Sequence, residues 1–129
     1  MPVKLAKIEY RRLNSRQQEN FNFQKVAGYL ADYGFNCLKL SDDWQGADFL
    51  ACHINGRDFL KVQLKGRMVI DPKYAGKDIY IAFLDGPRCY LYPHDEMRDR
   101  IYDLGYKFVS RSWPKLPEWA RALLDEHRL

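Results

Sequence analysis

Two strand-like runs joined by a glycine turn place the strongest limit on how this chain folds. Residues 49–53 and 59–65 are apolar or alternating segments, and Asn55-Gly56 lies between them. Asn-Gly between two such runs is a strong hairpin signal, because both central residues of a type I′ turn need positive φ. The sequence therefore predicts an antiparallel pair of strands closed by a type I′ turn.

The second strand of this hairpin has one polar and one apolar face. Because side chains alternate across a strand, Lys61, Gln63 and Lys65 point to one side. The residues between them point the other way, toward a helix or the core: Leu60, Val62 and Leu64. Asp48 precedes the first strand, so the hairpin brings a carboxylate, an amide and an ammonium group within reach of one another. Such a cluster can hold a hard cation against a phosphate.

Helices and further strands are expected on both sides of the hairpin. A capping box of Ser15 and Gln18 begins a helix that runs to about Asp32, and Gly34 ends it. The other expected elements are strands at 35–40, 79–83 and 89–92, helices at 94–102 and 118–127, and a further helical stretch at 3–12. Loops are expected at 41–46 and 68–77, the second with one helical turn after Pro72. This order predicts an α/β fold with a mixed β-sheet of about five strands flanked by helices.

The length of 129 residues predicts a single domain, 1–129. Its core motif region would be about 15–92, followed by a C-terminal helical segment at about 94–129. The chain has no apolar run of about 18 residues, so we expect no transmembrane helix and no membrane partner. Residues 1–7 lack an apolar signal-peptide segment, which indicates a cytoplasmic protein.

Glu19 is a further candidate for the polar cluster. It lies four residues before Phe23, so it continues the apolar stripe of the first helix: Phe23, Val26, Ala27 and Leu30. A carboxylate in this position either points into a site or is a helix-start residue favoured by the helix dipole.

Positive charge is concentrated in two windows, although the net charge is only +4. Residues 4–16 hold five basic residues and one acidic residue, and residues 61–77 hold the same numbers. Clustered positive charge suits a polyanion such as nucleic acid, whereas the alternative is a solvated basic face. The second window carries more weight, since it continues directly from the strand of Gln63 and Lys65.

A helix bearing Glu19, then Asp48, then Gln63-Leu64-Lys65 on the next strand resembles the PD-(D/E)XK nuclease superfamily. That superfamily includes type II restriction enzymes and archaeal Holliday junction resolvases. The resemblance covers about 19–83 and implies a restriction endonuclease-like core. Two positions depart from the pattern: Ala47 stands where the motif has proline, and Gln63 stands where Asp or Glu is usual. Some lineages carry Gln-x-Lys at that place.

The resemblance implies Mg²⁺-dependent hydrolysis of a phosphodiester, with Mn²⁺ as a substitute. Asp48, Gln63 and the Leu64 carbonyl would hold the metal, with Glu19 as a further ligand. Lys65 would orient the attacking water or stabilise charge on the phosphate. The expected contacts to nucleic acid are Lys61, Arg67, Lys73, Tyr74 and Lys77. The expected substrate is DNA, and a homodimer would supply the two sites that two-strand cutting requires.

Other functions remain open at this level. Loss of charge at Gln63 is compatible with a catalytically weak or inactive nucleic-acid-binding module on the same fold, and divalent metal binding separates the two. Asp48 and Lys65 could also form a surface ion pair on an ordinary strand, worth under about 1 kcal/mol. A metabolic or scaffold protein would show weak DNA affinity that does not respond to salt.

Overall fold

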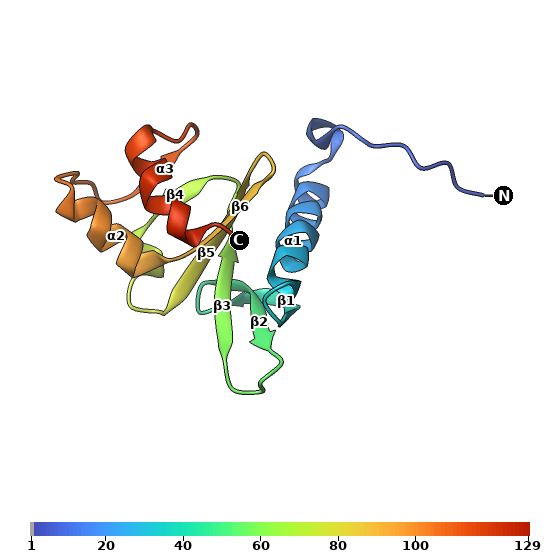
Figure 1. Cartoon of the computed structure of the whole chain (residues 1–129), viewed down its shortest axis with the longest axis horizontal. Helices are drawn as coiled ribbons and strands as arrows, with labels where there is room; N and C mark the ends of the chain where they lie inside the picture. Colours follow the sequence, from blue (N-terminus) through green and yellow to red (C-terminus); the bar gives the residue numbers. More distant parts are fainter. Residues whose placement is uncertain (1) are drawn as a thin grey trace.

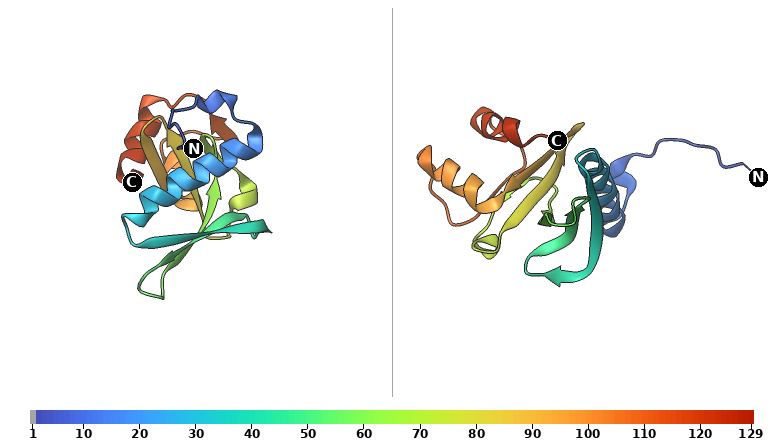
Figure 2. Two further views of the ribbon diagram at one scale, coloured as in Figure 1. Left: turned by 90° about the vertical axis from the view of Figure 1, so that its right-hand side faces the viewer. Right: turned by 60° about the horizontal axis from the view of Figure 1, so that its bottom comes forward.

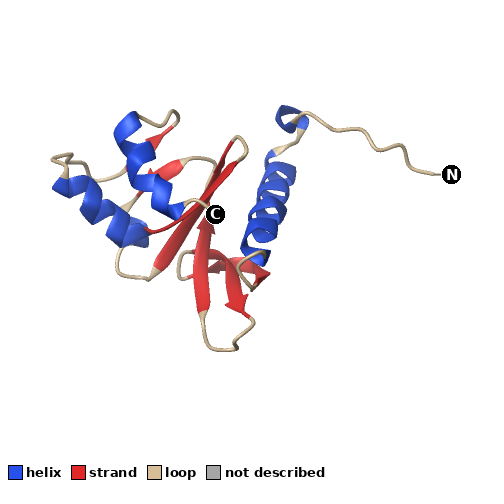
Figure 3. Cartoon of the chain, in the orientation of Figure 1, coloured by secondary structure: helices blue, strands red, loops and turns tan. Residues whose placement is uncertain are grey.

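A five-stranded mixed sheet forms the middle layer of the computed structural model, which describes residues 2–129 (Figures 1 and 3). Its strands are β1 (Phe35–Trp44), β2 (Ala47–His53), β3 (Phe59–Leu64), β5 (Ile79–Asp85) and β6 (Arg88–Pro93). The order across the sheet is β1-β2-β3-β5-β6. The β3–β5 pair is parallel, and the other neighbours are antiparallel. The predicted mixed sheet of five strands flanked by helices is confirmed.

Helices cover both faces of this sheet. The helix α1 (Ser15–Ala31) lies across one face, as the left view of Figure 2 shows. The other face carries α2 (His94–Asp103) and α3 (Glu118–Leu124), together with a small sheet of β4 (Met68–Ile70) and β7 (Arg111–Trp113) (Figure 1). Single helical turns complete the fold: η1 (Tyr10–Arg12), η2 (Pro72–Tyr74) and η3 (Asp125–His127).

Two apolar clusters hold the layers together. The α1 cluster consists of buried residues from α1 and the sheet: Val26, Leu30, Phe49, Ala51, Val62, Ala82 and Cys89. The larger aromatic cluster lies under α2, α3 and the small sheet, and includes Phe83, Tyr90, Tyr92, Met97 and Trp113. Full burial of one large apolar side chain stabilises a fold by about 1.5–3 kcal/mol, so the aromatic cluster supplies most of the stability. The expected helix stripe is confirmed, since Phe23, Val26 and Leu30 all pack here.

The start of the chain differs from the expectation in two ways. Asn14, and not Ser15, caps α1: its Oδ1 accepts from the Gln17 N–H at 2.8 Å, and Gln17 Oε1 accepts from the Asn14 N–H at 2.9 Å. The predicted helical stretch at 3–12 is reduced to η1, and the segment before it extends away from the body (Figure 1). Its apolar side chains are exposed, so it lacks the packed face that stabilises most short helices.

The connections of both hairpins differ from what their sequences predict: the tight two-residue turn joins β1 to β2, and a longer loop joins β2 to β3. Gln45 and Gly46 form the two-residue turn with positive φ values of 51° and 88°. Because this turn is so short, β1 continues to Trp44, and the prediction of a loop at 41–46 is wrong. The β2–β3 hairpin is confirmed, but its connection is a longer loop in which Asn55 Oδ1 accepts from the N–H groups of Arg57 and Asp58. That local hydrogen bonding replaces the predicted type I′ turn.

The remaining difference concerns residues 68–77, which were expected to form a loop. Residues 68–70 pair with 111–113 as β4 and β7, while the helical turn after Pro72 is confirmed as η2. The last helix is shorter than expected, because α3 ends at Leu124 and continues as η3. Among the helices of residues 2–129, none has the length and hydrophobicity that crossing a membrane would require.

Candidate active site

The β2–β3 register sets Asp48 against Gln63. Phe49 pairs with Val62, and the next positions along the same register are Asp48 and Gln63. The Leu64 N–H donates to Asp48 Oδ2 at 2.9 Å, which fixes the carboxylate over the end of β3. The main chain continues into Lys65, whose N–H donates to the Ala82 carbonyl on β5 at 2.9 Å. Two hydrogen bonds therefore position the polar end of the hairpin.

A polar cleft of about 420 Å³ opens at this place, between α1 and the end of β3. Its lining contains all of the residues that the sequence assigned to catalysis or metal binding. The lining residues are Tyr10, Ser15, Gln18, Glu19, Asn22, Asp48, Gln63, Leu64, Lys65 and Gly66. We call this hollow the β3 cleft. It brings the four predicted catalytic side chains together at the end of β3.

Asp48 and Gln63 lie in an electrostatically unusual environment. Burial raises the pKa of Asp48, and the negative charges of Glu19 and Asp43 raise it further, against the lowering effects of the Leu64 N–H and Lys65. Gln63 Oε1 is buried, and no donor within residues 2–129 lies at hydrogen-bonding distance from it. A buried acceptor without a donor costs about 1–3 kcal/mol. The cleft thus retains an oxygen that the protein itself does not satisfy.

The donor atoms in the β3 cleft suit a hard divalent cation. Glu19 and Asp48 offer carboxylates, Gln63 offers an amide oxygen, and the main chain offers the Leu64 carbonyl; Mg²⁺ prefers such oxygen ligands. The cluster contains only two acidic side chains, since position 63 is glutamine. Accordingly, no group of three or more His, Cys, Asp or Glu side chains in residues 2–129 is arranged to hold a metal.

Tyr74 differs from its expected place on the surface. It is 3% exposed and belongs to the aromatic cluster. Two ammonium groups lie over its ring, Lys65 Nζ at 5.3 Å and Lys73 Nζ at 5.2 Å from the centroid. A cation over a tyrosine ring is stabilised by about 0.5–1 kcal/mol at a partly exposed site. Tyr74 therefore supports two lysines and is not itself an exposed contact for phosphate.

The other expected nucleic-acid contacts surround the cleft at different depths. Arg67, Lys73 and Lys77 are exposed, and Lys61 is half-buried on β3, opposite Ile79. Arg67 lies two residues beyond Lys65 and lines a neighbouring hollow. Lys61 and Lys77 are not among the residues that line the β3 cleft.

Five lining residues lie outside the site that the sequence predicted: Tyr10, Ser15, Gln18, Asn22 and Gly66. Gln18 Nε2 donates to the Tyr10 carbonyl at 3.3 Å, and Asn22 Nδ2 donates to Tyr10 Oη at 2.9 Å. These bonds fold η1 back onto α1. Ser15, Gln18, Glu19 and Asn22 follow the i, i+3, i+4, i+7 spacing of one helix face, so this polar stripe could have been found from the sequence.

No family model matches the sequence, and no curated protein matches it either. Solved structures do share its fold. The Holliday junction resolvase Hjc of the hyperthermophilic archaeon Archaeoglobus fulgidus aligns with a TM-score of 0.50 and 14% identity, over 78% of this chain and 91% of its own. The bacterial homing endonuclease I-Ssp6803I aligns with a TM-score of 0.50 and 15% identity, over 88% of this chain and 94% of its own. At this level of identity the two likenesses show a shared fold, which is the restriction endonuclease-like fold that the sequence predicted.

Proposed function

We propose that this chain is a small metal-dependent endonuclease that cleaves DNA. The observation that carries the proposal is the unpaired, buried Gln63 Oε1 beside Asp48, in a cleft that Glu19 and Lys65 also line. A cation in the cleft would satisfy this oxygen. The superfamily fold supports the same function, because the similar structures are a resolvase and a homing endonuclease.

Each residue of the β3 cleft has a chemical task in this proposal. Asp48, Gln63, the Leu64 carbonyl and Glu19 would hold Mg²⁺, with Mn²⁺ as a substitute. The chemistry that such an ion supplies is polarisation of a phosphoryl oxygen and a lower pKa for the attacking water. Lys65 orients that water or stabilises the negative charge that grows on the phosphate.

Binding of the substrate would use the basic residues around the cleft. Cations position a nucleic acid through its phosphates. The candidates here are the half-buried Lys61 and the exposed Arg67, Lys73 and Lys77. Both Lys65 and Lys73 contact the ring of Tyr74, which would keep two positive charges near the scissile phosphate. A homodimer would supply a second cleft, as cutting of both strands requires.

A non-catalytic DNA-binding module is the second candidate. The neutral side chain at Gln63 favours it, since only two acidic residues line the cleft. Calorimetric titration with Mg²⁺ and Mn²⁺ separates the candidates. An endonuclease binds the ion in a way that Asp48→Asn removes, whereas a binding module retains DNA affinity without any metal affinity.

The test of the proposed function is a cleavage assay on plasmid, single-stranded and branched DNA, with Mg²⁺, with Mn²⁺ and with EDTA. We expect cleavage that needs the metal and is lost in Asp48→Asn and Lys65→Ala. Asp48→Asn keeps an oxygen for the Leu64 N–H, so its fold is preserved. Lys107→Ala removes an equal charge at an exposed position outside the cleft lining and serves as the control. Cleavage that is unchanged in either cleft variant would refute the assignment.

A further inference from the structure

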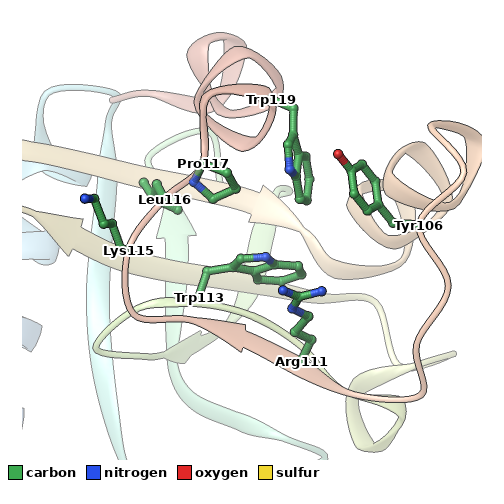
Figure 4. A pocket seen from close by; sticks show the side chains of 7 residues that line it. All are labelled: Tyr106, Arg111, Trp113, Lys115, Leu116, Pro117 and Trp119. Atoms are coloured by element: carbon green, nitrogen blue, oxygen red, sulfur yellow. The ribbon is translucent and has the colours of Figure 1, made fainter.

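A second hollow, of about 320 Å³, lies beside the aromatic cluster, between β7 and α3 (Figure 4). Tyr106, Arg111, Trp113, Lys115, Leu116, Pro117 and Trp119 line it, and we call it the aromatic pocket. The rings of Tyr106 and Trp119 stack at 4.4 Å, and Trp113 meets Trp119 edge-on at 5.8 Å. Rigid aromatic walls of this kind present flat apolar surface to a planar ligand.

The floor of the aromatic pocket contains a polar atom without a partner. Trp113 is 4% exposed, and its Nε1 has no acceptor within residues 2–129. In Figure 4 this nitrogen lies on the edge of the ring that faces Pro117 and Trp119. Buried indole N–H groups usually find an acceptor, so a ligand with a ring nitrogen or carbonyl oxygen would complete the floor.

The charge around the aromatic pocket selects the kind of ligand. Arg111 and Lys115 are exposed at its rim, and the Arg111 guanidinium lies 5.5 Å from the centroid of the Trp113 ring. Two cations disfavour a cationic ligand. Aromatic surface, an N–H donor and positive charge together suit a flat base that carries a phosphate.

A third hollow, of about 140 Å³, has lining residues in common with both the aromatic pocket and the β3 cleft. It shares Gly66 with the cleft, and it shares Trp113, Lys115 and Leu116 with the pocket. Arg67 and Arg121 also line it, and Arg121 pairs with Asp85 at 3.4 Å. With Lys115, the lining of this hollow holds three cations and one carboxylate. A nucleic-acid strand whose phosphate occupies the cleft can follow this hollow toward the aromatic pocket.

We propose that the aromatic pocket binds an unpaired nucleobase of the strand that is cut in the β3 cleft. This inference rests on the proposed function and narrows its substrate class. A base inside a duplex would first have to be unstacked and unpaired, at a cost of a few kcal/mol, whereas an unpaired base avoids most of that cost. The preferred substrates are therefore DNAs with unpaired nucleotides beside the cleaved bond, such as a duplex with a single-stranded branch or extension.

The test measures equilibrium binding in EDTA, where no cleavage occurs. The unaltered protein is titrated with a labelled duplex bearing a short thymidine extension, and with the same DNA in which the extension is abasic. We expect the thymidine extension to bind about tenfold more tightly, since stacking of one base on an aromatic side chain is of that order. Trp119→Ala should reduce this ratio to about one. Trp44→Ala is the control, because Trp44 is exposed on the β1–β2 hairpin and lines none of these three hollows.

Equal binding of the two DNAs by the unaltered protein would overturn the inference and leave the aromatic pocket to a different ligand. This comparison needs no variant, so poor folding of Trp119→Ala cannot obscure it. Metal-dependent cleavage of a plain duplex, together with equal binding, would reject the aromatic pocket alone. A protein that neither binds nor cleaves any of these DNAs would reject both proposals.

Discussion

Two polar clusters within this fold use their hydrogen bonds in opposite ways. The first lies where β6 meets α2, around His94, which is 1% exposed. The Asp71 N–H donates to His94 Nε2 at 3.0 Å, so the ring proton lies on Nδ1, 2.8 Å from Asp95 Oδ1. Tyr92 Oη donates to the Val69 carbonyl at 2.6 Å and accepts from the Val69 N–H at 3.0 Å. Each of these buried polar groups has its partners.

The second cluster is the β3 cleft, where one buried polar atom has no hydrogen-bond partner within residues 2–129. That atom is Gln63 Oε1. Burial and two neighbouring negative charges also raise the pKa of Asp48, because they disfavour its carboxylate form. Satisfied groups stabilise the fold and have no capacity left for a ligand. Unsatisfied groups lower stability and keep that capacity. The contrast teaches where the fold has been optimised for stability and where it has been left open for a ligand.

The largest expected effect is on catalysis. Lys65→Ala should lower the single-turnover cleavage rate by about 10²–10³-fold, since one group that stabilises transition-state charge contributes about that much. The melting temperature should stay nearly constant, because Lys65 is half-buried and makes only a cation–π contact with Tyr74. A large loss of melting temperature would break the comparison, since the β3 cleft would then be structural.

The next effect is on stability, in the satisfied cluster. His94→Ala should lower the free energy of unfolding by about 3 kcal/mol, because it leaves a cavity and an unpaired Asp71 N–H. Urea denaturation measures the change. His53→Ala is the control, with a loss of about 1 kcal/mol, since His53 accepts one hydrogen bond from Asn55 in an exposed loop. Equal losses in the two variants would show that the His94 cluster has no special role.

Placing an acid at position 63 should sharpen the contrast between the His94 cluster and the β3 cleft. Gln63→Glu should tighten Mg²⁺ binding on the order of tenfold, because affinity rises with the number of charged ligands. The metal-free variant should be less stable than the unaltered protein, since a third carboxylate joins Glu19 and Asp48. Calorimetry with Mg²⁺ measures the first effect and thermal melting in EDTA the second. Gln24→Glu, on the exposed side of α1, should change neither.

The smallest effect is a gain of stability. Asp48→Asn should raise the free energy of unfolding by about 0.5–1 kcal/mol at neutral pH, because it removes a charge that burial disfavours. The raised pKa of Asp48 means that the folded state holds this proton more tightly than the unfolded state. Stability from this proton is present below the usual aspartate pKa and is lost as the pH rises through the raised value.

The difference between Asp48→Asn and the unaltered protein should therefore vanish in acid and appear as the pH rises. Urea denaturation across this range measures it. Asp103→Asn, at an exposed position in α2, should show no such dependence. A loss of stability in Asp48→Asn at neutral pH would indicate that Asp48 is a structural carboxylate.

Local patterns made much of the fold predictable. The alternation on residues 59–65 identified β3, and Gly34 marked the end of α1. Elements that depend on distant partners were not predictable, as β4 and β7 show: each has three residues, and each is a strand only because the other pairs with it. The Gln45-Gly46 turn was missed because glutamine seldom takes positive φ.

The placement of the candidate site followed from one hairpin and one helix. Asp48, Gln63 and Lys65 could be found because a strand pair fixes their spacing, and Glu19 because it follows the helix stripe. Tyr10 enters the β3 cleft only through the folding of η1 onto α1, which no local pattern indicates. Tyr74 was expected to contact nucleic acid, but it is buried, and burial of a single aromatic residue in a turn depends on tertiary packing.

The parallel pairing of β3 with β5 has a consequence for the order in which the molecule assembles. The strands β1, β2 and β3 pair with their neighbours along the chain, so their contacts close short loops and should form early. Joining β5 to β3 closes a longer loop and brings in the half of the chain that ends with α3. Asp48 and Gln63 therefore meet before that slower step. Asp48 and Gln63 of the proposed metal site should thus lie in the rapidly folding part of the protein, and the aromatic pocket should complete last.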